Sequence, residues 1–501
     1  MRKLFHTLCL LCVLSLLTGC ADWLTALPGI KPVQPPSPIT PLPTWDGILE
    51  PGEQPYPTDP APLGTPEYLL PTEPPPTPNP VHAADPANAQ IFFYYNLPPS
   101  SPANNALNQI VDQFNRGNPY NILVDARNFA DPGQIYSETL PLLGTTYMPA
   151  ILMTDASMRT DPRYYHQLVD LDLFIRGPRW AVDTATQQDL VPSLMNLGFA
   201  TITETRRLAL PTGSDALGLY ANLEWFNALG QPNLPATPED FAALVCRAAK
   251  TPLPRTAQTN VTGYAFTTDL HTLAAWTFAF GGQLYSDDLG IYDFTQPAVL
   301  EATTFLNRLV RQGCAAARTP AQAQEDFLKG RTATFSAPIS NIRQVQAANE
   351  SGLAFFWEFN PLPASPSLYL FAPAPQLSIV SSVPLEQQAA AWYFLSYWVS
   401  TEAQNIWVSM TNHVPVRMSA LDLLRNAPPG FKRSMQDLSL SHIEPQSTQP
   451  EVIEQQIEEM FTKVFNGLPP ASALNALQEQ SSPLRLYLII TPIPASVPPQ
   501  P

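Results

Sequence analysis

The chain has 501 residues, of which 45% are hydrophobic and 14% are charged, and its formal net charge is −16 at pH 7. This length exceeds what one compact core normally spans, so we expect two lobes or domains. The acidic balance argues against a protein that binds nucleic acid or adheres to anionic lipid headgroups, because both carry negative charge.

The chain opens on a short apolar segment that ends in a cysteine. Residues 4–17 are almost all apolar and follow Arg2 and Lys3. Such a segment is too short to cross a bilayer and is typical of a secretory signal. The sequence LTGC at residues 17–20 resembles the bacterial lipobox, which implies acylation of Cys20 and a lipid anchor on the extracytoplasmic face of the cell membrane. An ordinary signal peptide with a chance cysteine is the alternative.

Two proline-rich segments flank the region that we expect to fold. Nineteen of the 53 residues from 28 to 80 are proline, which favours an extended spacer, with a recognition segment as the alternative. Residues 491–501, TPIPASVPPQP, are typical of a frayed tail. We therefore predict a signal peptide at 1–19, a lipid anchor and linker at 20–88, a two-lobe domain at 89–490 and a disordered tail at 491–501.

The folded region begins with alternating strand and helix patterns. Residues 91–95, 121–124 and 150–153 form short apolar runs that predict strands. Between the first two runs, apolar residues recur at helical spacing, and they are Leu107, Ile110, Val111 and Phe114. Strands that alternate with helices over short connections predict a parallel sheet wrapped by helices.

Further helices follow in the second part of the chain. Thr237 and Pro238 provide an N-cap and a proline at the first helical position of a helix that begins there. Apolar stripes predict three more helices over residues 299–310, 391–398 and 453–464. Gly313 and Gly467 are suited to close the first and the last of these three.

Cysteines and histidines give no evidence for a metal site. Outside the leader and the lipobox only Cys246 and Cys314 remain. In an oxidising compartment they can form a disulfide, and two unpaired buried thiols are the alternative. The six histidines are scattered, without HxxxH spacing, and there is no CxxC. We therefore expect neither a metal nor another cofactor.

Six segments, in chain order, resemble the bacterial extracellular solute-binding protein family 1, whose members bind sugars and glycerol phosphates for ABC importers. They are NALNQIVDQFNRGNP, ALGLYANLEWFNALGQPNLPATPEDFAAL, GYAFTTDLHTLAAWTFAFGGQLY, YDFTQPAVLEATTFLNRLVRQG, DFLKGRTATFS and AAAWYFLSYWVSTEAQNIWVSMTNHVPVRMSA. The resemblance implies an α/β, two-lobed periplasmic-binding-protein-like fold of type II, with a mixed sheet flanked by helices in each lobe and a hinge between them. It also implies a monomer that holds a small solute in the cleft between the lobes and delivers it to ABC permease subunits.

The same resemblance points to candidate ligand-binding residues, which follow strands or lie in segments that reach the cleft in this family. They are Tyr95, Asn96, Tyr136, Asp155, Ser214, Trp276, Gly282, Ser336 and Phe371. Two candidates have a structural alternative: Asp155 can be a helix cap, and Trp276 can be a core residue of an amphipathic helix.

Departures from the family pattern bear on the ligand. The first strand is followed by NLPP instead of the usual tryptophan or histidine. No Arg or Lys stands out at the cleft positions, which argues against a phosphate or carboxylate ligand and favours a neutral saccharide. A peptide ligand or a degenerate pocket is the alternative.

Two other functional classes are weighed against a receptor for import. A ligand-sensing or scaffold lipoprotein without transport is one of them. An anchored hydrolase is the other, but the chain has no GxSxG, SxxK or P-loop motif, and we expect no enzyme.

Overall fold

The computed structural model describes residues 79–487 apart from 199–205, 254–255, 257, 287–289, 353, 374–375, 426, 445, 448, 483 and 485. The chain divides into two units, residues 1–74 and 75–501. Every described residue belongs to the second unit. Cys20, nearly all of the first proline-rich segment and the tail at 491–501 therefore lie outside the described residues.

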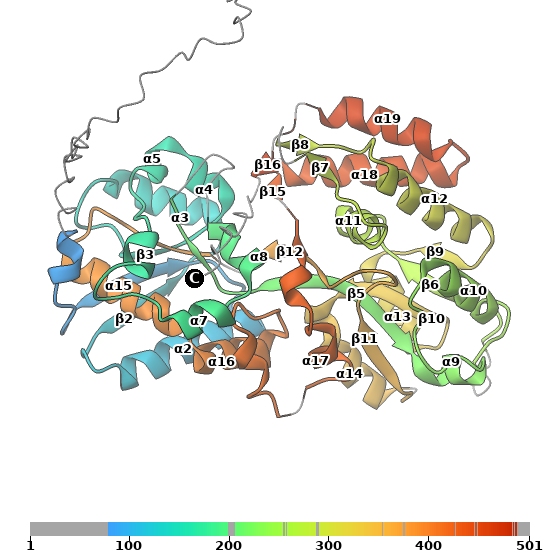
Figure 1. Ribbon diagram of the computed structural model, residues 1–501, viewed down its shortest axis with the longest axis horizontal. Coiled ribbons are helices and arrows are strands. Elements are labelled where there is room, and N and C mark those ends of the chain that lie inside the picture. The colour runs from blue at the N-terminus through green and yellow to red at the C-terminus, as the bar shows by residue number, and fades with distance from the viewer. Residues whose placement is uncertain are drawn as a thin grey trace, which may run out of the picture. The chain divides into compact units, whose positions relative to one another are not determined.

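The described residues form two lobes, each built on its own sheet (Figure 1). Lobe 1 holds a five-stranded sheet in the order β2-β1-β3-β13-β4. Its strands are β1 (Gln90–Tyr95), β2 (Leu123–Asn128), β3 (Ile151–Thr154), β4 (Leu210–Pro211) and β13 (Gln376–Ile379). β1 runs parallel to β2 and β3, as predicted, whereas β13 runs antiparallel to β3 and β4. The sheet is therefore mixed.

The helices of lobe 1 come from both halves of the chain. α2 packs on β2, α15 packs on β1 and β13, and α16 packs along α2. The helices are η1 (Pro80–Ala83), α2 (Pro102–Gly117), α3 (Pro132–Thr139), η2 (Leu140–Leu142), α4 (Ala156–Thr160), α5 (Pro162–Tyr165), α6 (Asp172–Ile175), α7 (Thr184–Asp189), α8 (Pro192–Met195), η3 (Asn196–Gly198), α15 (Leu385–Trp398), α16 (Thr401–Thr411) and η5 (Met418–Leu421). The predicted helices around Leu107 and over residues 391–398 are confirmed as α2 and α15.

The second strand begins two residues later than the apolar run suggested. Asn121 adopts a left-handed φ of 52°, and the Oδ1 of Asn118 accepts a hydrogen bond from the backbone N–H of Ile122 at 2.8 Å. Residues 118–122 therefore form the turn that ends α2, because an extended strand cannot contain that backbone conformation.

Lobe 2 holds a seven-stranded sheet in the order β14-β12-β5-β10-β6-β9, with β11 paired to β5. The strands are β5 (Ser214–Asn222), β6 (Thr262–Phe266), β9 (Ala315–Ala317), β10 (Thr332–Pro338), β11 (Trp357–Asn360), β12 (Tyr369–Pro373) and β14 (His442–Ile443). β6 runs parallel to β9 and β10, whereas β5 runs antiparallel to β10, β11 and β12. Two small antiparallel pairs complete the described strands: the hairpin of β7 (Tyr285–Ser286) with β8 (Ile291–Tyr292), and β15 (Gln446–Ser447) with β16 (Leu486–Tyr487), which α18 and α19 separate along the chain.

Sequence signals located the main helices of lobe 2. Thr237 caps α10 by accepting from the backbone N–H of Asp240, with Pro238 at the first helical position, as predicted. The helices are α9 (Leu223–Ala228), α10 (Pro238–Ala248), α11 (Leu270–Ala279), α12 (Pro297–Arg311), α13 (Pro320–Leu328), η4 (Ile339–Asn341), α14 (Ile342–Ser351), α17 (Phe431–Ser434), η6 (Leu438–Leu440), α18 (Pro450–Phe465) and α19 (Pro470–Ser481). Among the described residues, no helix is both long enough and apolar enough to span a membrane.

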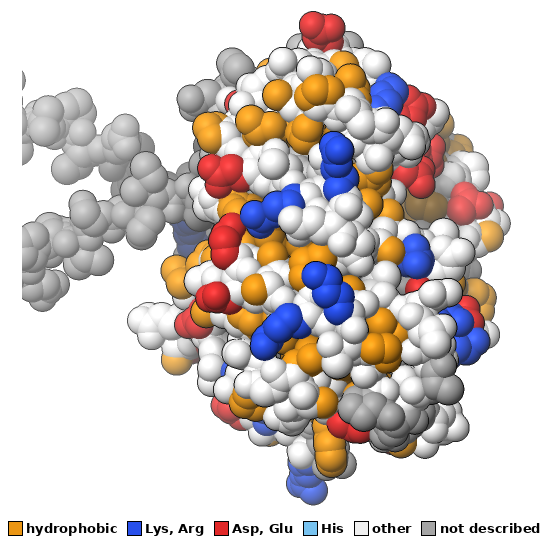
Figure 2. All heavy atoms as spheres, turned by 90° about the vertical axis from the view of Figure 1, so that its right-hand side faces the viewer, with side chains coloured by type: hydrophobic (Ala, Val, Ile, Leu, Met, Phe, Trp, Pro, Cys, Tyr) orange, Lys and Arg blue, Asp and Glu red, His pale blue; other side chains and the backbone are white. Residues whose placement is uncertain are grey.

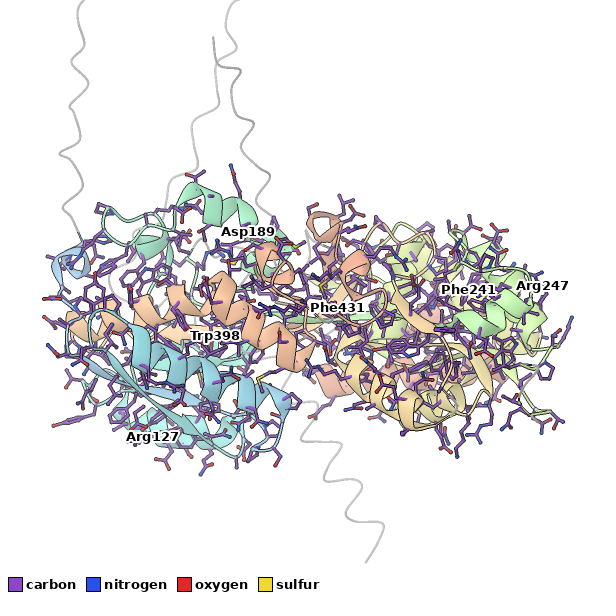
Figure 3. The ribbon with its side chains drawn as sticks, turned by 90° about the horizontal axis from the view of Figure 1, so that it is seen from below. Arg127, Asp189, Phe241, Arg247, Trp398 and Phe431 are labelled. Carbon is purple, nitrogen blue, oxygen red and sulfur yellow. A yellow bond between two sulfur atoms is a disulfide. The ribbon has the colours of Figure 1, made fainter. Side chains whose placement is uncertain are left out.

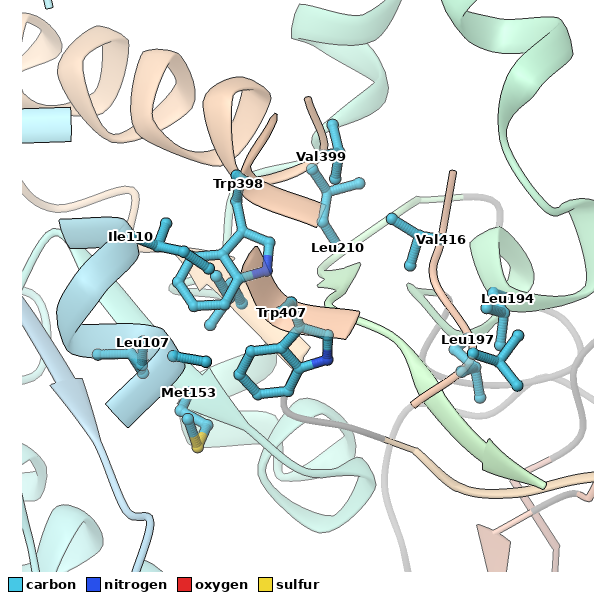
Figure 4. Packing of buried hydrophobic residues seen from close by; sticks show 14 of the residues in the cluster. Leu107, Ile110, Met153, Leu194, Leu197, Leu210, Trp398, Val399, Trp407 and Val416 are labelled. Carbon is cyan, nitrogen blue, oxygen red and sulfur yellow. The ribbon is translucent and has the colours of Figure 1, made fainter. Parts of the chain in front are cut away.

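Each lobe has a core rich in tryptophan and other aromatic residues. In lobe 1, Trp398 and Trp407 are buried side by side, with ring centroids 5.7 Å apart, next to Leu107 and Ile110 of α2 (Figure 4). In lobe 2, Phe241 of α10 is fully buried (Figure 3). Burial of such large side chains stabilises each lobe by about 1.5–3 kcal/mol per side chain.

Cys246 and Cys314 form a disulfide, which answers the question that the sequence left open. Their Cα atoms lie 4.4 Å apart, and 68 positions separate them along the chain. The bond ties α10 to the residue that precedes β9. It therefore fixes one edge of the lobe 2 sheet.

Basic side chains lie in the last turns of the helices at the edge of lobe 2 where the parallel strands begin. α10 carries Arg247 in its last turn, and α12 carries Arg308 and Arg311. These helices run opposite to the parallel strands that follow them, so their carboxyl ends gather at this edge, where cations stabilise the helix dipole. Figure 2 shows Lys and Arg side chains spread over this face of the molecule, and Figure 3 labels Arg247 at the far end of lobe 2.

Candidate functional site

The topology directs the carboxyl ends of the parallel strands of both lobes toward the segments that cross between them. In lobe 1, β13 begins at Gln376, which pairs with Thr154, the last residue of β3. In lobe 2, β5 begins at Ser214, at the end of the sheet where the antiparallel β10 finishes. Open α/β sheets hold their ligands at the carboxyl ends of their strands. The candidate site therefore lies between the two lobes, where the carboxyl ends of the strands of each sheet approach the crossing segments. We call these two rows of strand ends the lobe 1 edge and the lobe 2 edge of the site.

The crossing segments connect the two lobes. β4 of lobe 1 is followed by β5 of lobe 2 after residues 212–213, and β12 of lobe 2 is followed along the chain by β13 of lobe 1. A third segment joins them, because Ser214 and Val414 exchange two backbone hydrogen bonds of 3.1 and 2.8 Å. Asp215, next to this pair, accepts hydrogen bonds from the Oγ and the backbone N–H of Ser340 at 2.5 and 3.2 Å.

Tyr136 and Asp155 come together on the lobe 1 side of the site. Asp155 follows β3, and its Oδ1 accepts from the backbone N–H of Met158 and from the Oγ of Ser157, both at 2.7 Å. Burial raises the pKa of Tyr136 to about 12, against a hydrogen bond with Ser157 and with a small contribution from the charge of Asp155. The pair thus offers one exposed carboxylate and one neutral phenol.

Tyr95 lies in a network of amide side chains at the ends of β1 and β2. Its hydroxyl is 3.1 Å from Asn104 Oδ1 and 3.2 Å from Asn108 Oδ1, and the side chain is 3% exposed. Asn128 donates to the same Asn104 oxygen at 3.2 Å. Asn96, directly after β1, is half-buried. The tyrosine hydroxyl is therefore already used inside the protein, which leaves Asn96 as the candidate at this strand end.

His271 lies on the lobe 2 side of the site, and its ring stacks on the buried Phe371. The two ring centroids are 4.0 Å apart, and Phe371 is 4% exposed. The Nδ1 of His271 is 3.0 Å from Glu444 Oε2, and its Nε2 is 4.0 Å from Glu454 Oε1. Burial by itself lowers the pKa of His271, but the charge and hydrogen bond of Glu444 outweigh it and raise that pKa to about 9. At neutral pH this side of the site therefore carries an imidazolium held by carboxylates.

A cavity of about 470 Å³ opens beside this histidine at the carboxyl ends of β6 and β9. Its lining is mostly hydroxyl and charged, and it includes Thr267, Thr268, Asp269, Arg318, Glu454 and Glu458. Arg318 donates to Asp326 at 2.9 Å. The cavity therefore presents mainly hydrogen-bond acceptors to a ligand.

Comparison with known proteins agrees with this architecture. The sequence model of the family described as bacterial extracellular solute-binding protein matches residues 173–434, which is more than half of the chain. The chain belongs to this family. A comparison with curated protein sequences gives no match.

Several solved structures of solute-binding proteins share the fold of this chain. The sugar-binding protein MalE from Xanthomonas citri is 17% identical, with a TM-score of 0.64, and the match covers 79% of this chain and 97% of that one. The cyclic α-maltosyl-1,6-maltose binding protein from Arthrobacter globiformis is 17% identical, with a TM-score of 0.61 and coverages of 79% and 98%. UgpB from Mycobacterium tuberculosis, solved with glycerophosphocholine, is 17% identical, with a TM-score of 0.57 and coverages of 79% and 98%. The chain is therefore a two-lobed α/β solute-binding protein.

Trp276 lies in the core of lobe 2, which corrects our expectation of a ligand contact. Its side chain is fully buried, and its Nε1 donates to the hydroxyl of Tyr264 at 3.1 Å. The ring packs against Phe241 and Phe305. The alternative of a core tryptophan is the one that the structure supports.

Four further candidates also have structural roles in the solute-binding protein. Ser336 is 2% exposed and lies 3.1 Å from the same Tyr264 hydroxyl. Ser214 is fully buried, and its Oγ donates to the carbonyl of Phe371 at 2.9 Å. A Cβ at Gly282 would lie 2.4 Å from the Cβ of Ala298, so this glycine allows the close approach of α12. Phe371 is 4% exposed and packs in the core of lobe 2 against the ring of His271. Tyr136, Asp155 and Asn96 therefore remain as candidates from the sequence.

His271, Glu444 and Asp269 were not predicted. Asp269 and His271 lie three and five residues after the end of β6, in the sequence FTTDLH, so a search a few residues beyond each strand end could have found them. Glu444 lies 173 positions from His271, and no local pattern in the sequence joins the two. Among the described residues, no group of three or more His, Cys, Asp and Glu side chains is arranged to hold a metal ion.

Proposed function

We propose that this protein is the extracytoplasmic receptor of an ABC importer and that it captures a neutral carbohydrate between its lobes. The observation that carries the proposal is the approach of two polar strand edges to one set of crossing segments. Tyr136 and Asp155 lie on one edge, and His271 stacked on Phe371 lies on the other. Carboxylates accept hydrogen bonds from sugar hydroxyls, imidazolium donates them, and aromatic faces pack against sugar C–H groups.

The charge of the two edges supports an uncharged ligand. Two arginines do lie at these edges, although neither stood out as a cleft residue in the sequence, and both are engaged by the protein. Arg159 is 2% exposed and donates to the carbonyl of Thr154 at 3.2 Å, and Arg318 pairs with Asp326. An anionic ligand needs a cationic clamp that is free to meet it. The acidic lining around Asp269 and Glu454 would repel such a ligand.

Capture and delivery are consistent with two lobes joined by crossing segments. A ligand that contacts both lobes stabilises a closed arrangement, and an importer can recognise that arrangement. Solved proteins of similar fold include a MalE and a cyclic maltosyl-maltose binding protein, which supports a saccharide. The lipobox-like LTGC supports acylation of Cys20, and it therefore supports attachment to the outer face of the cell membrane.

A thermal-shift screen of the full chain tests the ligand class. Maltose, maltotriose, cyclic maltosyl-maltose, polyols, glycerol 3-phosphate, glycerophosphocholine and tripeptides are compared at pH 7. We expect a neutral saccharide to raise the melting temperature, because a ligand at 100 times its Kd adds about 2.7 kcal/mol of stability. A shift with phosphate compounds or tripeptides alone would contradict the carbohydrate assignment.

Import is tested separately from binding. A strain that lacks the gene is assayed for uptake of the radiolabelled saccharide that gives the largest thermal shift. We expect uptake to fall and to return when the gene is restored. Unchanged uptake, together with a clear thermal shift, would favour a ligand sensor over a transport receptor.

A further inference from the structure

His413 lies where the segment that follows α16 joins the segment that leads from β4 into β5. It directly precedes Val414, whose backbone exchanges hydrogen bonds of 3.1 and 2.8 Å with Ser214. The packing at this point is close, because a Cβ at Gly213 would lie 2.8 Å from the carbonyl oxygen of Val414 and 3.0 Å from Trp407 Nε1. We call residues 212–216 and 412–416 the lobe junction.

Gln404 of α16 bonds to both segments of the lobe junction. Its side chain is fully buried, and its Nε2 donates to the carbonyl of Thr212 at 3.3 Å. Its Oε1 accepts from the backbone N–H of Val416 at 2.9 Å. His413 therefore lies between two ties, because the pairing of Val414 follows it directly and the bond to Val416 comes two residues later.

The ring of His413 packs against a buried tryptophan. Its centroid lies 5.8 Å from that of Trp407 in an edge-to-face arrangement, and Trp407 is fully buried. The His413 side chain is only partly exposed, and its Nδ1 is buried without a hydrogen-bond partner among the described residues. A neutral imidazole can carry its single N–H on Nε2, which leaves no proton at the buried nitrogen.

Protonation of His413 would add a second N–H at this buried position, because an imidazolium carries a proton on both ring nitrogens. A buried donor without an acceptor costs more free energy than an ordinary hydrogen bond contributes. Burial accordingly lowers the pKa of His413, so the ring is neutral at pH 7. A proton can therefore be held only if the ring moves.

The nearest carboxylate is already engaged by the protein. The charge of Asp215 on β5 favours the protonated form of His413, but burial outweighs it. Asp215 also accepts hydrogen bonds from the Oγ and the backbone N–H of Ser340 and from the backbone N–H of Ala216. It therefore attracts the imidazolium without compensating for the burial.

Other ionisable groups near the lobe junction also have partners. Arg343 of α14 donates to Asn412 Oδ1 at 3.3 Å, and this cation opposes a second positive charge beside it. Arg417, four residues after His413, pairs with Asp189 of α7 at 2.6 Å. The hydroxyl of Tyr220 on β5 donates to a backbone carbonyl at 2.7 Å.

We propose that His413 makes the lobe junction sensitive to pH. When the imidazole gains a proton, the ring leaves its place beside Trp407, and the pairing of Val414 with Ser214 breaks. The two lobes are then held less firmly to one another at acidic pH than at neutral pH. The proposal concerns the chain without ligand, so it can fail or succeed independently of the receptor function.

Hydrogen exchange of the full chain without ligand tests this proposal. Peptides that cover the lobe junction are followed by mass spectrometry at pH 7.5 and pH 5, with correction for the intrinsic pH dependence of exchange. We expect their protection to fall at least tenfold at pH 5, whereas peptides from β1 keep theirs. Exchange at the imidazole C2 in the same samples gives the titration midpoint of His413, which should lie below 6.5 and coincide with the loss of protection.

Matched variants assign the effect to one histidine. His413→Gln cannot gain a proton, so the protection of its lobe junction should not depend on pH. His166→Gln, at an exposed histidine, and His271→Gln, at a histidine whose pKa of about 9 keeps it protonated throughout this range, should behave like the wild type. Unchanged protection in the wild type, or an equal fall in His413→Gln, would overturn the proposal. If His413→Gln does not fold, a His413 midpoint that differs from the pH of the loss of protection would overturn it instead.

Discussion

His271 Nδ1 lies 3.0 Å from Glu444 Oε2, and this contact joins the first turn of α11 to the residue that follows β14. The carboxylate of Glu454 on α18 lies 4.0 Å from the other ring nitrogen. Two carboxylates from neighbouring parts of the chain thus meet an imidazole that lies 173 positions before the first of them. The pKa of His271 rises from 6.5 to about 9, which makes the contact an ion pair at neutral pH.

This ion pair predicts a stability change between pH 6.5 and pH 9. The pKa is raised in the folded state, so the stabilisation is fully present below the unfolded pKa of about 6.5 and is lost as the pH rises through about 9. Urea unfolding of the wild type and of His271→Gln should therefore show a free-energy difference that shrinks across this window. His166→Gln, at an exposed histidine, should show no such trend. A difference for His271→Gln that stays constant from pH 6 to pH 9.5 would disprove the ion pair.

Trp276 predicts a loss of stability rather than a selective loss of binding. Trp276→Ala removes a fully buried indole and its hydrogen bond to Tyr264. We expect the free energy of unfolding to fall by about 3–5 kcal/mol, as for other large core side chains. Tyr147→Ala, at an exposed side chain, should change it by about 0.5 kcal/mol at most. A stable Trp276→Ala protein with weakened ligand binding would return this residue to the solute site.

Much of the fold could be predicted from the sequence because its signals are local. Thr237 with Pro238 marks the start of α10, and the apolar spacing from Leu107 to Phe114 marks α2. The antiparallel β13 could not be found in this way. Its partner in lobe 1, Thr154, lies more than 200 positions earlier, and no local pattern specifies a pairing over that distance.

The site could be predicted only in part, for a related reason. Asp155 follows directly from its place after a buried strand. Trp276 could not be assigned, because α11 is buried on nearly all sides. A pattern that is apolar all round does not show which of its residues face a cleft. Glu444 reaches His271 only through the fold of lobe 2.

Asp155 allows the solute-binding role to be separated from the helix-capping role. Asparagine caps helices as well as aspartate does, so Asp155→Asn should keep α4 and the melting temperature while it removes the charge. We expect binding of the identified saccharide to weaken by about 1.5–3 kcal/mol, the value typical of a hydrogen bond to a charged group. Asp131→Asn, which replaces the cap of α3, is the matched control for isothermal titration. Equal affinities for the two variants would leave Asp155 with the capping role alone.

The disulfide predicts a stability that depends on reductant. The bond closes a loop with a sequence separation of 68, for which the chain-entropy relation gives a stabilisation of about 4 kcal/mol. Denaturant unfolding with dithiothreitol should therefore show a lower midpoint than unfolding without it. Cys246→Ala with Cys314→Ala should lower the midpoint by a similar amount and should no longer respond to dithiothreitol. Equal midpoints for the wild type in both conditions would show that the bond adds no stability.

Cys20 predicts where the protein is found in the cell. If the LTGC sequence acts as a lipobox, Cys20→Ser prevents acylation, and the protein should move from the membrane fraction to the soluble extracytoplasmic fraction. Two or more acyl chains hold a protein firmly, because each buried methylene contributes about 0.8 kcal/mol. Cys246→Ala with Cys314→Ala keeps Cys20 and should remain in the membrane fraction. The two variants differ only in which cysteines remain, so a Cys20→Ser protein that stays with the membrane would mean that something other than an acyl chain retains it.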